Sequence, residues 1–251
     1  MKFSLGKILI LSVSIFVIYA CTKDAGNNPS TAAASTGIGG SLSKFTIAGN
    51  YLYAVDNHFL YSYDISNPAN PVKTNTSALN FDIETIYPFN NRLFIGTRTG
   101  LLIYSIDTPS IPSKIAEAKH ARSCDPVVAN DSIAFVTLKG NGSCGPAVSG
   151  LYVHNIKNIL APVLLKTVPI ANPEGLGLKG SILYICCNND GLKVYDVSNP
   201  ANPVEKTTVT GKYFKDVIPY NNQLICFVSD GLSLYDISNP VNPVLVTHIS
   251  N

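Results

Sequence analysis

The ten residues YDISNPANPV, from Tyr63 to Val72, recur as YDVSNPANPV from Tyr195 and as YDISNPVNPV from Tyr235. A catalytic motif is normally needed once in a chain, whereas a structural unit of a repeat protein returns at a fixed period. The recurrence therefore indicates architecture before it indicates chemistry.

Two weaker copies complete the series. Aligned on the tyrosine of the motif, the five copies are marked by Tyr63, Tyr104, His154, Tyr195 and Tyr235. These positions follow one another at a nearly constant period, except for a longer step between the second and the third, which a nine-residue insertion in the third copy explains. The expected repeats are about 42–79, 80–119, 120–170, 171–211 and 212–251.

Each repeat contains four short segments of strand-like composition. In the fourth copy these are LGLKG, SILYICC, GLKVYDVS and PVEKTTV, which are rich in β-branched and aromatic residues and are separated by Gly, Asn, Asp and Pro. No window keeps a helical apolar period. A four-stranded unit that repeats every forty-odd residues is typical of a propeller blade. We predict an all-β fold, a propeller of about five four-stranded blades.

The third segments resemble the motif of the LVIVD-repeat family. The similar stretches are LKVYDVS, residues 192–198, and LSLYDIS, residues 232–238. The first, fourth and fifth copies fit well. The second has Ser105 in place of the aspartate, and the third has His154-Asn155 in place of Tyr-Asp. The resemblance implies a bacterial secreted or surface propeller, and it implies no particular reaction.

The repeated decapeptide has a structural explanation. Its aspartate stands near the end of a strand, where a carboxylate can accept backbone N–H groups of the next turn. The two Asn-Pro pairs then stop that strand, since proline donates no ladder hydrogen bond. A metal-binding role for Asp64, Asp196 and Asp236 is disfavoured, because they belong to different blades and cannot share one ion.

Residues 1–41 lie outside the predicted propeller. Residues 1–20 have a positive start, an apolar run and a small residue before Cys21, which is the order of a secretory signal. The sequence IYAC resembles a bacterial lipoprotein box, so Cys21 is the expected site of lipidation. Residues 21–41 are polar and small and indicate a flexible tether. We expect an outer-membrane lipoprotein of the bacterial cell envelope, on the periplasmic side or at the cell surface.

Charge excludes one class of partner. Without the signal segment, which holds two lysines and no acid, the chain has 16 basic and 16 acidic residues. Nucleic-acid binding requires an excess of basic residues, so it is disfavoured. The expected partners are the membrane, through the lipid anchor, and an envelope protein, peptide or glycan. A monomer is expected.

The remaining cysteines fall into two groups. Cys124 precedes the first strand of the third repeat and Cys144 lies in its insertion, so both belong to loops on one face. In an oxidising compartment we predict a disulfide between them, worth roughly 3 kcal/mol for a loop of about 20 residues. Cys186, Cys187 and Cys226 stand within second strands and are expected to be buried, without zinc.

A candidate binding site emerges at one mouth of the central channel. Polar residues begin the innermost strands, and the divergent third copy adds a loop with a histidine and an arginine, which makes this face asymmetric. The candidate mouth residues are Glu84, His120, Arg122, Asp125, Glu174, Lys215 and Asp216. The alternative is that these side chains only satisfy neighbouring backbone amides or face water.

Two functions remain open at this point. The first is a non-catalytic binding or interaction module that uses the channel-mouth face and needs no cofactor, supported by the absence of a nucleophile–base set in the sequence. The alternative is a propeller hydrolase or lyase that uses mouth carboxylates such as Glu84, Asp125, Glu174 and Asp216. Such carboxylates could also hold Ca²⁺.

Overall fold

The computed structural model describes residues 39–79, 82–119, 126–140 and 148–251. Over these residues the chain forms β-strands and turns, and no helix there is long and apolar enough to cross a membrane. The predicted all-β architecture is confirmed.

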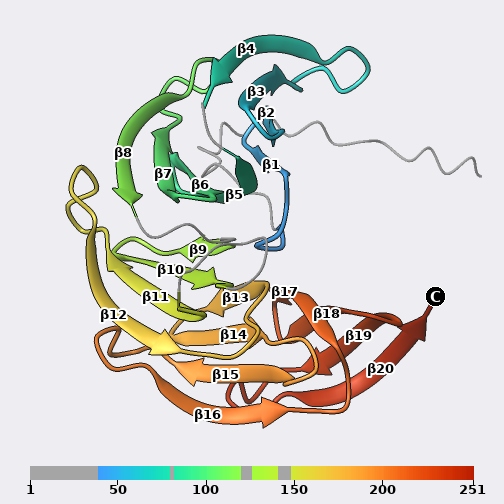
Figure 1. Ribbon diagram of the computed structural model, residues 1–251. Coiled ribbons are helices and arrows are strands. Elements are labelled where there is room, and N and C mark those ends of the chain that lie inside the picture. Colours follow the sequence, from blue (N-terminus) through green and yellow to red (C-terminus); the bar gives the residue numbers. More distant parts are fainter. Residues whose placement is uncertain (1–38, 80–81, 120–125, 141–147) are drawn as a thin grey trace, which may run out of the picture. The chain divides into compact units, whose positions relative to one another are not determined.

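In the described ranges, twenty strands form five antiparallel sheets of four, each built from consecutive strands (Figure 1). The sheets follow one another around a common axis, with the first strand of each sheet innermost and the fourth outermost. Blade 1 is β1 (Phe45–Ala48), β2 (Tyr51–Val55), β3 (Phe59–Asp64) and β4 (Val72–Ala78). Blade 2 is β5 (Ile83–Phe89), β6 (Arg92–Thr97), β7 (Gly100–Ser105) and β8 (Ser113–Lys119).

The other three blades repeat this order. Blade 3 is β9 (Val127–Ala129), β10 (Ile133–Leu138), β11 (Gly150–Asn155) and β12 (Val163–Pro169). Blade 4 is β13 (Leu176–Lys179), β14 (Ile182–Cys186), β15 (Leu192–Asp196) and β16 (Val204–Val209). Blade 5 is β17 (Phe214–Tyr220), β18 (Gln223–Val228), β19 (Gly231–Asp236) and β20 (Val244–Ser250). This is the arrangement of a five-bladed β-propeller.

The repeated decapeptide forms the turn between the third and fourth strands, as predicted. In blade 5 the Asp236 carboxylate accepts the backbone N–H of Ser238 at 2.8 Å, and Asp64 and Asp196 make the same bond in blades 1 and 4. The hydrogen bonds lower the pKa of all three carboxyls. The aspartates are therefore turn residues.

The divergent copies build the same turn with other side chains. In blade 2 the Ser105 hydroxyl accepts the N–H of Asp107 at 3.1 Å, and in blade 3 the Asn155 side chain accepts the N–H of Lys157 at 2.9 Å. A shift of strand register occurs just before the motif tyrosine or its equivalent His154 in every blade. Loss of the Asp therefore does not change the local fold.

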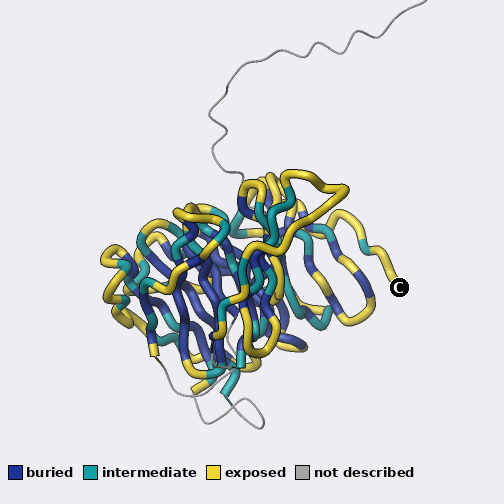
Figure 2. The backbone as a smooth tube through the Cα atoms, turned by 90° about the horizontal axis from the view of Figure 1, so that it is seen from above, coloured by how far each residue is buried: buried dark blue, intermediate teal, exposed yellow. Residues whose placement is uncertain are grey.

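The hydrophobic core is divided among the spaces between consecutive blades. In the described part of the chain, four clusters of buried residues join blades 1 and 2, 2 and 3, 3 and 4, and 4 and 5. Burial is most complete in the second strands of blades 3 and 4, which have a described blade on each side. Every residue of β10 and of β14 is buried. In Figure 2 buried residues line the strands and exposed residues mark the turns.

Two hydrogen bonds reinforce these contacts between blades. The Tyr53 hydroxyl of β2 donates to the Pro109 carbonyl in the turn of blade 2 at 2.9 Å. The Tyr184 hydroxyl of β14 donates to the Pro240 carbonyl in the turn of blade 5 at 2.7 Å. Both tyrosines are buried, so each bond satisfies a hydroxyl that has lost its contact with bulk water. The turn between the third and fourth strands thus also accepts a hydrogen bond from the preceding blade at these two junctions.

Candidate functional site

A pocket of about 490 Å³ lies at one mouth of the propeller, on the side opposite the decapeptide turns. Segments that lead into the first strands of blades 1 to 4 form it, together with the loops that follow second strands. Its lining residues are Leu42, Lys44, Asn57, Asp82, Ile83, Glu84, Thr85, Arg98, Pro126, Lys139, Pro173 and Glu174. The sequence predicts a site at this mouth, and two of the predicted residues, Glu84 and Glu174, line the pocket.

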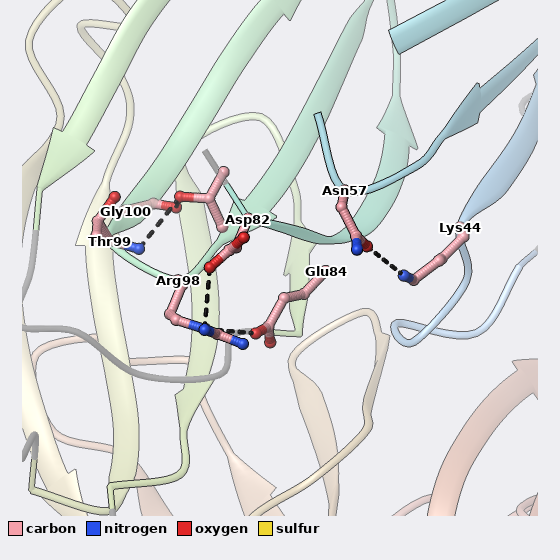
Figure 3. Close-up of polar contacts among 8 residues, drawn as sticks. Lys44, Asn57, Asp82, Glu84, Arg98, Thr99 and Gly100 are labelled. Atoms are coloured by element: carbon pink, nitrogen blue, oxygen red, sulfur yellow. Dashed lines mark hydrogen bonds and ion pairs between the residues drawn. The ribbon is translucent and has the colours of Figure 1, made fainter. Parts of the chain in front are cut away.

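One side of the pocket is organised around Arg98, in the loop between β6 and β7 (Figure 3). Its guanidinium lies 3.0 Å from an Asp82 carboxylate oxygen and 3.7 Å from a Glu84 oxygen. The Arg98 backbone N–H also donates to the Asp82 carbonyl at 3.0 Å. Both acids come from the segment that begins β5, so the loop and the strand hold one arginine between two carboxylates.

The pocket lining contains a second ion pair. Lys139, directly after β10, places its ammonium group 2.6 Å from a Glu174 carboxylate oxygen. The Glu174 backbone is fixed as well, because its N–H donates to the Cys186 carbonyl and its carbonyl accepts the Thr137 hydroxyl at 2.6 Å. A third cation, Lys44, reaches the Asn57 side chain at 3.5 Å (Figure 3). Among the described residues, the pocket lining therefore carries three cations and three carboxylates.

Sequence reasoning missed Arg98 and Lys139, although the repeat register contains them. Equivalent positions of the five second strands are occupied by Leu52, Leu93, Ala134, Leu183 and Leu224, and Arg98 and Lys139 each stand five residues after theirs. At that position blades 1, 4 and 5 have Asn57, Asn188 and Ser229. The prediction compared the repeats only at the starts of the first strands, and it considered a loop after a second strand only for the insertion of the third copy. The loop after the second strand emerges at the same mouth, so the same alignment extended by one loop would have identified both cations.

Asp216 and Lys215, two predicted mouth residues, do not line this pocket. The Asp216 carboxylate instead accepts hydrogen bonds from the Ser41 hydroxyl at 3.1 Å, the Leu42 N–H at 3.3 Å and the Val217 N–H at 2.9 Å. The Ser41 hydroxyl in turn accepts the Leu176 N–H at 2.7 Å. Asp216 therefore ties the segment that leads into blade 1 to blades 4 and 5.

Two glycines allow this close approach. A Cβ added at Gly40 or at Gly175 would overlap the Asp216 carboxylate. Burial raises the pKa of Asp216, and it outweighs the hydrogen bonds that lower it. The Lys215 ammonium group lies 5.0 Å from the centre of the Phe227 ring, away from the pocket.

Several predicted residues fall outside the described part of the chain. These are Cys21, His120, Arg122, Cys124, Asp125 and Cys144. The lipidation site, the disulfide and three of the mouth residues therefore stay predictions. The described cysteines, Cys186, Cys187 and Cys226, are buried, as expected, and free. Burial raises the pKa of all three thiols, that of Cys187 to about 12.

A serine, a histidine and an aspartate also meet in blade 5. The Ser233 hydroxyl lies 3.0 Å from His248 Nδ1, and His248 Nε2 lies 3.4 Å from an Asp230 carboxylate oxygen. Ser233 is fully buried between strands, so a substrate cannot reach its hydroxyl. Lys212 additionally contacts Asp230 at 2.6 Å. This cluster is structural.

The described residues contain no group of three or more His, Cys, Asp or Glu side chains placed to hold a metal ion. At the pocket itself, Asp82 and Glu84 lie against Arg98, and Glu174 lies against Lys139. A divalent cation would have to compete with these charged groups for the carboxylates. The arrangement is better suited to a ligand that offers both a positive and a negative group.

The raised pKa of Asp216 predicts a specific pH dependence. A carboxyl that binds its proton more tightly in the folded state stabilises the fold most at acid pH, and this contribution falls as the pH rises from the unfolded pKa through the folded one. In Asp216→Asn the amide oxygen can still accept a hydrogen bond, but the site no longer titrates. Urea unfolding between about pH 3 and pH 7 should therefore show wild type losing stability relative to Asp216→Asn as pH rises. A constant difference would contradict this.

Comparisons with known proteins agree with the geometry. The model of the LVIVD repeat matches residues 39–76, 172–211 and 224–250, in blades 1, 4 and 5. No curated protein matches the chain. Among solved structures, a functionally unknown protein from Desulfotomaculum acetoxidans has a TM-score of 0.62 at 11% identity, with 80% of this chain and 66% of that chain covered. A Lactobacillus plantarum protein has a TM-score of 0.63 at 11% identity, with 80% and 68% covered.

A third similar structure is AztD from Citrobacter koseri, with a TM-score of 0.56 at 12% identity and 80% and 59% covered. At these identities the likeness concerns the fold alone. The chain spans about two thirds of the length of the first two neighbours. The described part of the chain is a five-bladed β-propeller, and three of its segments match the LVIVD repeat.

Proposed function

We propose that this propeller is a non-catalytic binding module whose mouth pocket captures a small zwitterionic ligand, such as the end of a peptide chain. The observation that carries the proposal is the equal number of cations and carboxylates in the described lining of the pocket. Three cations, Lys44, Arg98 and Lys139, stand among three carboxylates, Asp82, Glu84 and Glu174. The described part of the lining has no net charge, and it therefore favours neither a polyanion nor a polycation.

The pocket has the other attributes of a binding site. It is concave, its volume is within the range of small-ligand sites, and apolar groups of Leu42, Pro126 and Pro173 stand beside the charges. The paired side chains are only partly buried, so a ligand can reach their charged groups. It can replace a contact between the two partners without a large rearrangement of the pocket. Rigid strands from four blades support the lining. These features favour recognition by positioned charges.

The alternative, a hydrolase or lyase that uses mouth carboxylates, has less support. A general acid and a general base must differ in their surroundings, because the environment decides which carboxyl keeps its proton. Here Glu84 and Glu174 have similar surroundings, since the first is close to Arg98 and the second is close to Lys139. These two described carboxyls of the pocket therefore lack the contrast in surroundings that acid–base catalysis by two carboxyls requires. We therefore keep binding as the proposed function.

The ligand class can be tested with free amino acids and tripeptides. Titration calorimetry should detect binding of a tripeptide with free ends and weaker binding of the same tripeptide after N-acetylation or C-amidation. Lys139→Met keeps the length of the side chain, removes its charge and should weaken binding by about tenfold or more. Lys193→Met is the matched control, because Lys193 is ion-paired to Glu205 at 2.9 Å and does not line the pocket.

The outcomes separate the alternatives. Loss of binding in Lys139→Met but not in Lys193→Met supports the pocket. Equal binding by both variants would place the ligand elsewhere. Absence of binding for the whole panel, with wild type folded, would contradict the zwitterion proposal.

We also propose that the module is attached to a bacterial envelope membrane through a lipid on Cys21. The support is the order of residues 1–21, a positive start, an apolar run and a small residue before the cysteine. Cys21→Ser should abolish metabolic labelling with an alkyne fatty acid and release the protein from the membrane fraction. Thr22→Ala is the control. Undiminished labelling of Cys21→Ser would contradict the anchor.

A further inference from the structure

Two of the three cations in the mouth pocket are already paired with carboxylates. Arg98 Nη1 lies 3.0 Å from an Asp82 carboxylate oxygen, and Lys139 Nζ lies 2.6 Å from a Glu174 carboxylate oxygen. Both distances are typical of charge-assisted hydrogen bonds. The Arg98 Nε atom is buried, so a ligand cannot reach it. A ligand carboxylate at Arg98 or Lys139 would therefore have to compete with a carboxylate of the protein.

Lys44, the third cation, has no such competitor. Within the described ranges its ammonium group forms no ion pair and contacts the neutral Asn57 side chain, with Nζ 3.5 Å from Oδ1 (Figure 3). This distance is at the outer limit for a hydrogen bond. A lysine ammonium group has three N–H donors. Lys44 can therefore donate at least two hydrogen bonds to a ligand and keep its contact with Asn57.

The repeat explains why blade 1 differs from blade 2. In blade 2 the loop after the second strand carries the cation, Arg98, and the segment that begins the first strand carries two acids, Asp82 and Glu84. The residues at the equivalent positions of blade 1 are Asn57, Ser41 and Ser43. The cation of blade 1 comes instead from Lys44, at a position where the other blades have Thr85, Pro126, Gly175 and Asp216. Blade 1 thus contributes a positive group to the pocket without an acid of its own at these positions.

The backbones of Lys44 and Asn57 are both fixed. The Lys44 carbonyl accepts the Val55 N–H of β2 at 2.8 Å, and the Asn57 carbonyl accepts the Ile83 N–H of β5 at 3.1 Å. Because the Asn57 side-chain oxygen faces Lys44, the amide N–H groups of Asn57 can donate to a ligand. An ammonium group and an amide side by side can each donate to one oxygen of a carboxylate.

We propose that Lys44 and Asn57 bind the negative end of the ligand, the C-terminal carboxylate of a peptide, and so fix the orientation of the ligand in the pocket. This orientation rests on the proposed function, since it assigns one end of the zwitterion to one side of the same pocket. The ligand ammonium group is then left to the carboxylates of the lining. The reverse orientation would place two positive groups together at Lys44, and no described carboxylate is paired with Lys44 to relieve the repulsion.

Titration calorimetry with trialanine and its C-terminal amide tests the orientation. Amidation removes the negative charge, so it should weaken binding to wild type by about tenfold or more. In Lys44→Met the two peptides should bind with nearly equal affinity, because the group that distinguishes them is gone. Lys44→Arg keeps the positive charge and should restore the difference.

Lys139→Met is the matched comparison, because it removes the same charge from the same pocket. It should weaken binding but keep most of the difference between the two peptides, which separates direct contact from the net charge of the pocket. Lys193→Met, outside the pocket, should behave as wild type. A difference that is lost in Lys139→Met and kept in Lys44→Met would overturn the orientation, although binding in the pocket would stand.

Acetate distinguishes a failure of this orientation from a failure of the proposed function, because it is a carboxylate without an ammonium group. The side-chain amide signals of Asn57 in a ¹⁵N–¹H NMR spectrum can be identified by their loss in Asn57→Ser. Titration with acetate at constant ionic strength should shift them saturably in wild type and not in Lys44→Met. If trialanine does not bind but acetate gives this shift, the zwitterion proposal fails and the carboxylate site stands. If neither has an effect, both are overturned.

Discussion

Packing of one blade face on the next is the interaction on which the rest of this structure depends. A single four-stranded sheet has two faces rich in apolar residues and cannot cover either by itself. In the described part of this chain the core consists of four separate clusters, each shared by two consecutive blades. The fold is therefore stabilised like a repeat array, by contacts between neighbouring blades. No described blade covers the outer face of blade 1, where Phe45 is exposed, or the outer face of blade 5, where Leu232 is exposed.

Much of this fold could be predicted from the sequence, because the decapeptide repeats at nearly constant spacing and its residues have local roles. Asp64, Asp196 and Asp236 act in turns wherever they occur, and Ser105 and Asn155 perform the same task in the divergent blades. Local hydrogen bonding of this kind depends on a few neighbouring residues. Each copy of the turn therefore marks the end of a third strand, and the spacing of the copies indicates the length and strand order of a blade.

The candidate site was only partly predictable. Glu84 and Glu174 were predicted because they lie at or just before the start of a first strand, whereas Arg98 and Lys139 lie in loops after second strands. Asp216 was expected at the mouth, but the segment that contains Gly40 and Ser41 passes against it. That segment does not repeat, so no periodicity could indicate what it contacts. The exposed outer faces of blades 1 and 5 could not be predicted either. The repeat period indicates the length and strand order of a blade, but it does not indicate how the first and last blades are placed.

The turns on one side of the propeller are similar in all five blades, whereas the loops at the mouth differ from blade to blade. The turns on one side are nearly identical, while the loops on the other side carry arginine, lysine, asparagine or serine at one repeat position. A rigid frame with variable loops is the usual basis of recognition in repeat proteins. Here it places cations and carboxylates from four blades around one pocket.

The central claim is that a residue of the blade face is buried only where a neighbouring blade covers it. Thiol labelling tests it most directly, with cysteine introduced one at a time at the equivalent positions Phe45, Ile86, Val127, Leu176 and Val217, in dilute protein. Modification should be rapid at position 45, and at the other four positions it should be slower by about a hundredfold or more, because those thiols react only after local opening. Slow modification at position 45, equal to that at the other four, would contradict the claim.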